Sequence, residues 1–295
     1  MTKINFFHSL IFFNLTIFLS AFEYLRNNSL LMISLFLILA LGITHGSLDH
    51  VKGKILLKFL KIKNYAFFFI GYILISILTI LIWLVIPKLL LLIFLIVASY
   101  HFGKEDSGFI KSKSNIDVIY FFKGSLVIIA PLLFHKSETL NIFNNLNFDI
   151  SQSLFTSSEF LYAFIAISLF ANIIISSKKQ IDIKSLLLMD SISILLLNYF
   201  FSPILAFTIY FCFLHSIRHS FKLANELNKK NFIKGFKEFL VKAMPLTILT
   251  AFLFLISLFF LNNYYFFDNA ISKVIFIGLA SLTFPHILLE YLLEK

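Results

Sequence analysis

The chain has 295 residues, of which 59% are hydrophobic and only 14% are charged, with 25 basic against 15 acidic side chains. Soluble domains carry roughly a quarter of charged residues and are less than half apolar, so this composition excludes an ordinary soluble protein. In lipid only helices and closed barrels satisfy every backbone polar group, and barrel strands alternate polar and apolar residues. The apolar runs here do not alternate, which predicts an all-α polytopic membrane bundle.

The first apolar run, Ile4 to Phe22, resembles the start of a secretory signal. It is long for a signal core and lacks a clean small-x-small cleavage motif, so we expect a retained first span. The single Cys212 excludes an internal disulfide and gives no indication of an oxidising compartment.

Ten apolar runs are long enough to cross a membrane, for which roughly 20 residues are needed. They cover residues 4–23, 30–49, 65–86, 88–102, 117–135, 158–177, 184–201, 203–220, 243–261 and 271–292. The third and fourth runs are joined by Ile-Pro-Lys, which leaves a kinked or broken pair open. We expect the two longest breaks, 136–157 and 221–242, to hold at most a short amphipathic helix. The whole chain, 1–295, is thus interpreted as one transmembrane domain.

Basic residues are distributed unequally between alternate connections. Connections 50–64, 103–117, 178–184 and 221–242 carry 5, 3, 3 and 6 lysines, and Lys3 and Lys295 bring that side to 19. The other side holds Arg26, Lys88, Lys136 and Lys273. This positive-inside asymmetry predicts cytoplasmic termini. The same asymmetry explains the net charge of +10, since lysines on the inner side suit anionic lipid head groups. The charge therefore does not indicate nucleic-acid binding.

Histidines are concentrated where the predicted spans approach the inner side. Spans two, four, eight and ten contribute His45, His101, His215 with His219, and His286, all at similar predicted depth. Ionisable groups within a membrane are costly and usually functional, and the i,i+4 pair at 215 and 219 places both rings on one helix face. The pattern indicates a metal site, with ordinary packing histidines as the alternative. His8 and His135 lie away from these motifs.

Carboxylates follow three of these histidines at a spacing of four residues: Asp49, Glu105 and Glu290. A metal-binding histidine normally donates its second ring N–H to a carboxylate or carbonyl. Asp49 is the best candidate for that role, whereas Glu105 and Glu290 are equally well explained as interfacial charges. Arg218 needs a partner if it is buried; Asp49, Asp190, Glu105 or the inner membrane surface could each provide one.

An all-imidazole site suits iron, copper or zinc, and the ligand types alone do not choose among them. No catalytic side chain beyond the metal ligands is predicted. Tyr100 and Tyr210, close to the ligand helices, could assist at the site, although ordinary interfacial or core tyrosines are the simpler interpretation. A transporter, an intramembrane metal-dependent hydrolase and a non-catalytic membrane factor remain alternatives. The hydrolase would normally show a carboxylate base such as H-E-x-x-H, which the sequence lacks.

The segments "GITHGSLDH", "SYHFGKED", "HSIRH" and "FPH", in this order on a ten-span chain, resemble the Brp/Blh family of bacterial β-carotene 15,15′-dioxygenases. The resemblance implies an enzyme of the bacterial inner membrane that splits the central double bond of β-carotene with O2 into two all-trans-retinals. Membrane lipid surrounds such an enzyme, and the retinal typically goes to a microbial rhodopsin. The implied cofactor is Fe(2+), and the implied ligands are His45, His101, His215 and His219. Residues that could orient these ligands or act as additional ligands are Asp49, His50, Glu105, Arg218 and His286.

Overall fold

The computed structural model of the chain describes residues 2–28, 30–110, 117–149, 157–177 and 179–294. All regular secondary structure in these ranges is helical. Within them, ten helices are long and apolar enough to cross a membrane. The prediction of a ten-span, all-α membrane protein is therefore confirmed.

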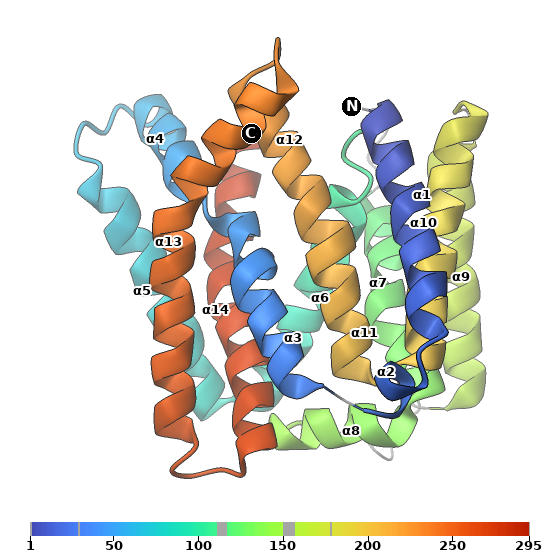
Figure 1. Cartoon of the computed structure of the whole chain (residues 1–295). Coiled ribbons are helices and arrows are strands. Elements are labelled where there is room, and N and C mark those ends of the chain that lie inside the picture. The colour runs from blue at the N-terminus through green and yellow to red at the C-terminus, as the bar shows by residue number, and fades with distance from the viewer. Residues whose placement is uncertain (1, 29, 111–116, 150–156, 178, 295) are drawn as a thin grey trace. The chain divides into compact units, whose positions relative to one another are not determined.

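The spans follow the predicted order (Figure 1). Two short helices, α2 (Glu23–Asn27) and α8 (Lys136–Asn145), lie between spans. The single-helix spans are α1 (Thr2–Ser20), α5 (Ala66–Val85), α6 (Pro87–Glu105), α7 (Asp117–Phe134), α9 (Ser158–Ser176), α10 (Ile181–Phe200), α13 (Phe232–Leu261) and α14 (Phe267–Glu294). The two composite spans are α3 (Leu31–Leu37) with η1 (Ile38–Gly42), η2 (Ile43–Gly46) and α4 (Asp49–Phe59), and α11 (Pro203–Ile209) with η4 (Tyr210–Ser216) and α12 (Ile217–Leu227).

The third and fourth spans are separate helices. The backbone leaves helical geometry at Ile86, with φ −133° and ψ 62°, and the next helix begins at Pro87. Proline suits the first helical position because the N–H that it lacks would have no partner within the helix. The interpretation as a broken pair therefore holds.

The predicted break at 221–242 is wrong, because most of it is helical. α12 continues to Leu227, and α13 begins at Phe232, where the Asn231 side chain accepts a hydrogen bond from the N–H of Lys234 at 3.0 Å. Lysine and glutamate are good helix formers, so hydropathy located the apolar part of each helix and missed its polar end. The other long break agrees with expectation in holding α8, although residues 150–156 lie outside the described residues.

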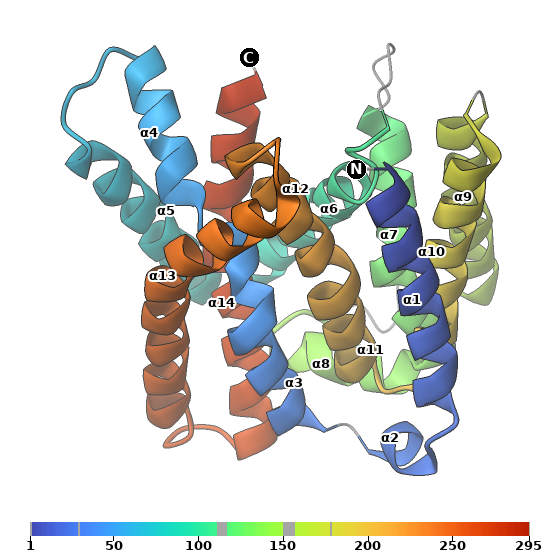
Figure 2. The same ribbon diagram turned by 45° about the horizontal axis from the view of Figure 1, so that its top comes forward.

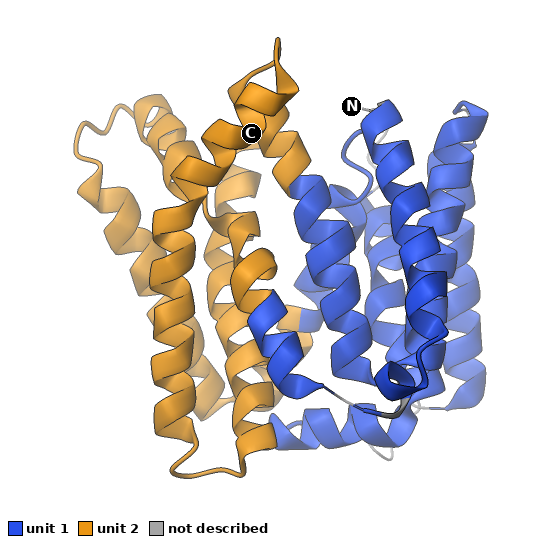
Figure 3. Ribbon diagram, in the orientation of Figure 1, with its two compact units in different colours: residues 1–37, 95–219 blue, residues 38–94, 220–295 orange. Residues whose placement is uncertain are grey.

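The chain forms two compact units (Figure 3). Unit 1 comprises residues 1–37 and 95–219. Within it, α1 packs along α10, α7 packs along α9, and α10 also contacts both α7 and α9 (Figures 1 and 2). Glycines allow a close approach of α6 and α7, since a Cβ at Gly103 would collide with the Tyr120 carbonyl and one at Gly124 with the Ser99 carbonyl. This contact fixes the end of α6 that carries the histidine motif.

Unit 2 comprises residues 38–94 and 220–295, and α14 is its central helix. α4, α5 and α13 each pack against α14. A buried apolar cluster ties the start of α4 to α12 and α13 through Leu48, Leu223, Ala224, Phe239 and Ala243. The histidine motif of the second span is thereby anchored to the packed part of this unit.

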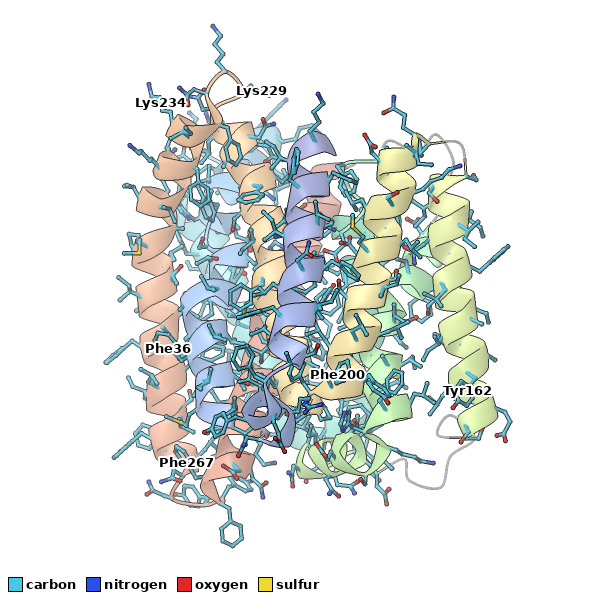
Figure 4. The ribbon with its side chains drawn as sticks, turned by 45° about the vertical axis from the view of Figure 1, so that its right-hand side comes forward. Phe36, Tyr162, Phe200, Lys229, Lys234 and Phe267 are labelled. Atoms are coloured by element: carbon cyan, nitrogen blue, oxygen red, sulfur yellow. The ribbon has the colours of Figure 1, made fainter. Side chains whose placement is uncertain are left out.

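Lysine-rich connections share one end of unit 2. Figure 1 shows the α4–α5 and α12–α13 connections at the same end, and Figure 4 shows Lys229 and Lys234 there, with Phe267, the first residue of α14, at the opposite end. This arrangement agrees with the alternation on which the predicted topology rests. Four lysines of that count lie outside the described residues: Lys111, Lys113, Lys178 and Lys295.

Two spans of unit 2 expose most of their apolar surface. In an apolar stretch of 18 residues from each helix, only 11% of α5 and 17% of α13 is buried. Exposed side chains include Phe67 and Leu84 on α5 and Phe252 and Phe259 on α13. Apolar surface of this extent is unfavourable in water, so these faces are suited to lipid.

Candidate metal centre

Three of the predicted histidines lie in unit 1, one near the end of a span and two within another. His101 is near the end of α6, His215 is in η4 and His219 is in α12; all three are buried. The ring centroids of His101 and His215 are 5.3 Å apart, at an interplanar angle of 70°. The predicted ligands from spans four and eight are thus brought together.

Carboxylates orient two of these rings. His215 donates from Nδ1 to Asp106 Oδ1 at 2.9 Å, and His219 donates from Nδ1 to Glu105 Oε2 at 2.8 Å. An ionised carboxylate only accepts, so each ring is protonated at Nδ1 and, when it is neutral, carries its lone pair at Nε2. Glu105 thus holds the ring of a candidate ligand, but that histidine is on another span, which the i,i+4 spacing on its own helix did not reveal; the role of Glu105 toward a metal stays a prediction.

Asp106 is a site residue that the sequence argument missed. Its Oδ2 accepts from the Tyr210 hydroxyl at 2.6 Å while Oδ1 holds His215. Burial by itself raises the pKa of Asp106, but His215, Lys123 and Arg218 outweigh burial and hold that pKa well below its usual range. These three neighbours therefore favour the ionised form of Asp106. The available signal was its position directly after Glu105, which is one residue beyond the i,i+4 spacing from His101.

Arg218 makes a structural ion pair, as expected for an arginine buried between two candidate ligands. Its Nη1 and Nη2 donate to the two carboxylate oxygens of Asp190 at 2.7 and 3.1 Å. Nη2 also donates to Ser9 Oγ at 2.7 Å, and Nη1 to the backbone carbonyl of Asp106 at 3.1 Å. Of the partners left open, Asp190 is the one observed. The pair links α1, α10 and α12 around the helix that carries the histidines.

His8 is closer to this region than the sequence indicated. Its Nε2 donates to the Phe213 carbonyl at 2.8 Å. Phe213 lies in η4, a π-helical stretch in which the ordinary i to i−4 ladder is interrupted, and such stretches are frequent at functional sites. No partner motif marked His8 in the sequence, and this contact arises from packing between spans.

The remaining predicted site residues lie in unit 2. His45 in η2 and His286 in α14 have ring centroids 4.8 Å apart at 61°, and both are buried. His286 Nδ1 lies 2.9 Å from both Asp49 oxygens. Tyr72 on α5 donates to Asp49 Oδ2 at 2.9 Å. Asp49 thus holds a buried histidine by its ring N–H, and that histidine is His286 on another span; the role of Asp49 toward a metal stays a prediction.

His50 and Glu290 have other partners in this unit. His50 Nδ1 donates to the Ser47 carbonyl at 3.0 Å, and Lys52 forms an ion pair with Glu290. Glu290 also has a carboxylate oxygen within 4.8 Å of a ring nitrogen of His286, so its two predicted roles stay alternatives. Both tyrosines singled out in the sequence bind carboxylates through their hydroxyls, Tyr100 to Asp117 at 3.1 Å and Tyr210 to Asp106.

The donor set fits a transition metal. Three buried imidazoles have Nδ1 held by a carboxylate, which leaves Nε2 as the nitrogen that carries the lone pair, and two further buried imidazoles lie edge to face with members of that group. Carboxylate–histidine pairs of this kind orient metal ligands and increase their basicity. The ten-span fold and these oriented imidazoles together define a multi-pass membrane protein with the side chains of a metalloenzyme.

The chain belongs to the beta-carotene 15,15′-dioxygenase family, since the model of that family matches residues 36–294. It is also 28% identical over 264 residues to the beta-carotene 15,15′-dioxygenase of uncultured marine bacterium 66A03. That alignment covers 87% of this chain and 91% of the relative. No solved structure matches the chain. Family membership confirms the resemblance seen in the motifs and identifies the chain as a carotenoid-cleaving dioxygenase.

Proposed function

We propose that this chain cleaves the central 15,15′ double bond of β-carotene with O2 inside the membrane and releases two all-trans-retinals. The proposed cofactor is Fe(2+), and its proposed ligands are His45, His101, His215 and His219. The observation that carries this proposal is the set of buried, carboxylate-oriented imidazoles in a chain of this family. A transporter or a hydrolase would not account for the family membership.

Iron would supply the activation of O2, and zinc, which has no redox chemistry, could not. The protein's own contribution is the orientation of the ligand rings. Asp106 and Glu105 hold the Nδ1–H of His215 and His219, so both rings are fixed in one tautomer and one direction. Tyr210 in turn fixes the carboxylate of Asp106. This support is of the kind that a reactive centre needs if its geometry is to survive repeated turnover.

The substrate is a rod-like hydrocarbon that dissolves in the bilayer, so an enzyme within the membrane needs no extraction step. The exposed apolar faces of α5 and α13 support the proposal that the chain is embedded in the bilayer. Cleavage at the centre of a symmetric polyene is a problem of position, because the protein must hold the midpoint at the reactive centre. We propose that units 1 and 2 act as one carotenoid-cleaving domain, which the family match to segments of both units supports.

The proposed location is the bacterial inner membrane with both termini cytoplasmic, supported by the lysine asymmetry. Retinal would leave into the surrounding lipid and reach a microbial rhodopsin in the same membrane. We propose no nucleic-acid partner.

The decisive experiment is turnover by the purified chain in lipid nanodiscs. Protein reconstituted with Fe(2+) should convert each β-carotene to two retinals and consume one O2, measured by chromatography and an oxygen electrode. Zinc-loaded protein is the matched control and should be inactive. Apocarotenals longer than retinal as the main products, or equal activity with zinc, would contradict the proposal.

A further inference from the structure

We propose that His286 on α14 is an additional metal ligand beside His45. This inference rests on the proposed function, since it concerns the same metal, and it extends the ligand set from four imidazoles to five. The motif "FPH" that contains His286 is otherwise unexplained by the four-ligand assignment.

The first argument is the chemical state of the ring. Both oxygens of Asp49 lie 2.9 Å from His286 Nδ1, and an ionised carboxylate can only accept. In a neutral ring the proton is therefore at Nδ1 and the lone pair at Nε2, which is the tautomer that a metal ligand requires. His215 and His219 are held in the same way by Asp106 and Glu105. His286 thus shares a construction with two of the proposed ligands.

The second argument is the position of the ring within unit 2. Its centroid lies 4.8 Å from that of His45, a separation close to the 5.3 Å between His101 and His215 in unit 1. His286 is 3% exposed and His45 is 7% exposed. One ring nitrogen of His45 and one of His286 lie within 4.8 Å of each other, a separation at which the two rings can hold a common ion.

The third argument is the rigidity of the support. Tyr72 donates to Asp49 Oδ2 at 2.9 Å and lies within 3.3 Å of the Leu282 carbonyl on α14. α5 and α14 lie side by side in unit 2 (Figures 1 and 2), so one tyrosine ties the carboxylate to the helix that carries His286. His50, by contrast, is only partly buried and donates to the nearby Ser47 carbonyl, which is the pattern of a packing histidine.

The competing explanation is that His286 only holds Asp49 in place. Two substitutions separate the explanations. In His286→Asn the side-chain amide can replace Nδ1 and still donate to Asp49, but no atom remains where Nε2 was. His286→Gln can place an amide near the former Nε2 and gives up the bond to Asp49. His135→Ala is the matched control, because His135 lies outside the site at the start of α8.

The test measures iron affinity by chelator competition in purified, folded protein, separately from turnover. We expect His286→Asn to weaken iron binding more than about 100-fold, beyond the about 10–100-fold typical of changes in groups that only orient ligands. Wild-type affinity in His286→Asn would overturn the inference. If neither variant folds, X-ray absorption of the iron-loaded wild type decides: about five imidazole nitrogens support the inference, and four contradict it. Failure of the wild type to bind iron or to form retinal would instead refute the proposed function.

Discussion

The carboxylate of Asp106 gives the sharpest test of how the protein supports its metal ligands. It accepts one hydrogen bond from His215 and one from Tyr210, at 2.9 and 2.6 Å, and it is buried near Lys123 and Arg218. In Asp106→Asn the remaining carbonyl oxygen can accept only one of these bonds well, and the amide NH2 faces the other donor. The substitution therefore removes about one hydrogen bond to a charged group, about 1.5–3 kcal/mol.

If that loss acts through the orientation of His215, iron affinity should fall about 10–100-fold, since each 1.4 kcal/mol corresponds to about tenfold. The same range is typical for groups that orient metal ligands. Tyr210→Phe removes one donor and leaves the carboxylate intact, so we expect a smaller loss. Chelator competition with purified protein measures both.

The control is Asp117→Asn, because Asp117 is exposed and binds Tyr100 away from the histidines. Iron affinity there should equal that of the wild type. The reasoning is refuted if Asp106→Asn binds iron as tightly as the wild type, or if Tyr210→Phe has the larger effect.

Three further outcomes are expected. Breaking the ion pair with Arg218→Met should destabilise the protein by about 3–5 kcal/mol in denaturant unfolding, because Asp190 is then left buried and uncompensated. The double variant with Asp190→Leu should recover most of the lost stability. Additive losses from the two substitutions would contradict the pairing. Reporter fusions at Lys229 and at Asn147 should score on opposite sides of the membrane, whereas the same side for both would refute the topology. Alanine at any one proposed ligand should abolish retinal formation and reduce bound iron. The control His135→Ala should be near wild type in both assays. Loss of iron binding in His135→Ala, with iron retained in the ligand variants, would refute the proposed site. The ligand positions for that series are His45, His101, His215 and His219.

The spans were predictable because hydrophobic length is a local property, and all ten overlap the predicted runs, although the polar ends of some helices extend beyond them. The orienting carboxylates were only partly predictable. Spacing along one helix identified Asp49 and Glu105 as candidates, but their partners His286 and His219 are on other spans, and helix periodicity carries no information about contacts between helices. The partner of Arg218 was undecidable for the same reason, since only packing selects Asp190 from several acidic residues.

The π-helical stretches constrain how the length of this chain can vary. η4 ends one residue after His215, and η1 ends shortly before His45. A π-helical stretch accommodates one residue more than the α-helical ladder, and each residue of an α-helix turns the chain by about 100°. Deleting a single residue within 210–214 would therefore rotate His215 and His219 together, away from Asp106 and Glu105, even though every side chain of the site is retained. Substitutions in this stretch can be absorbed by repacking, whereas insertions and deletions cannot. In comparisons among family members, the number of residues here is thus as informative as their identity.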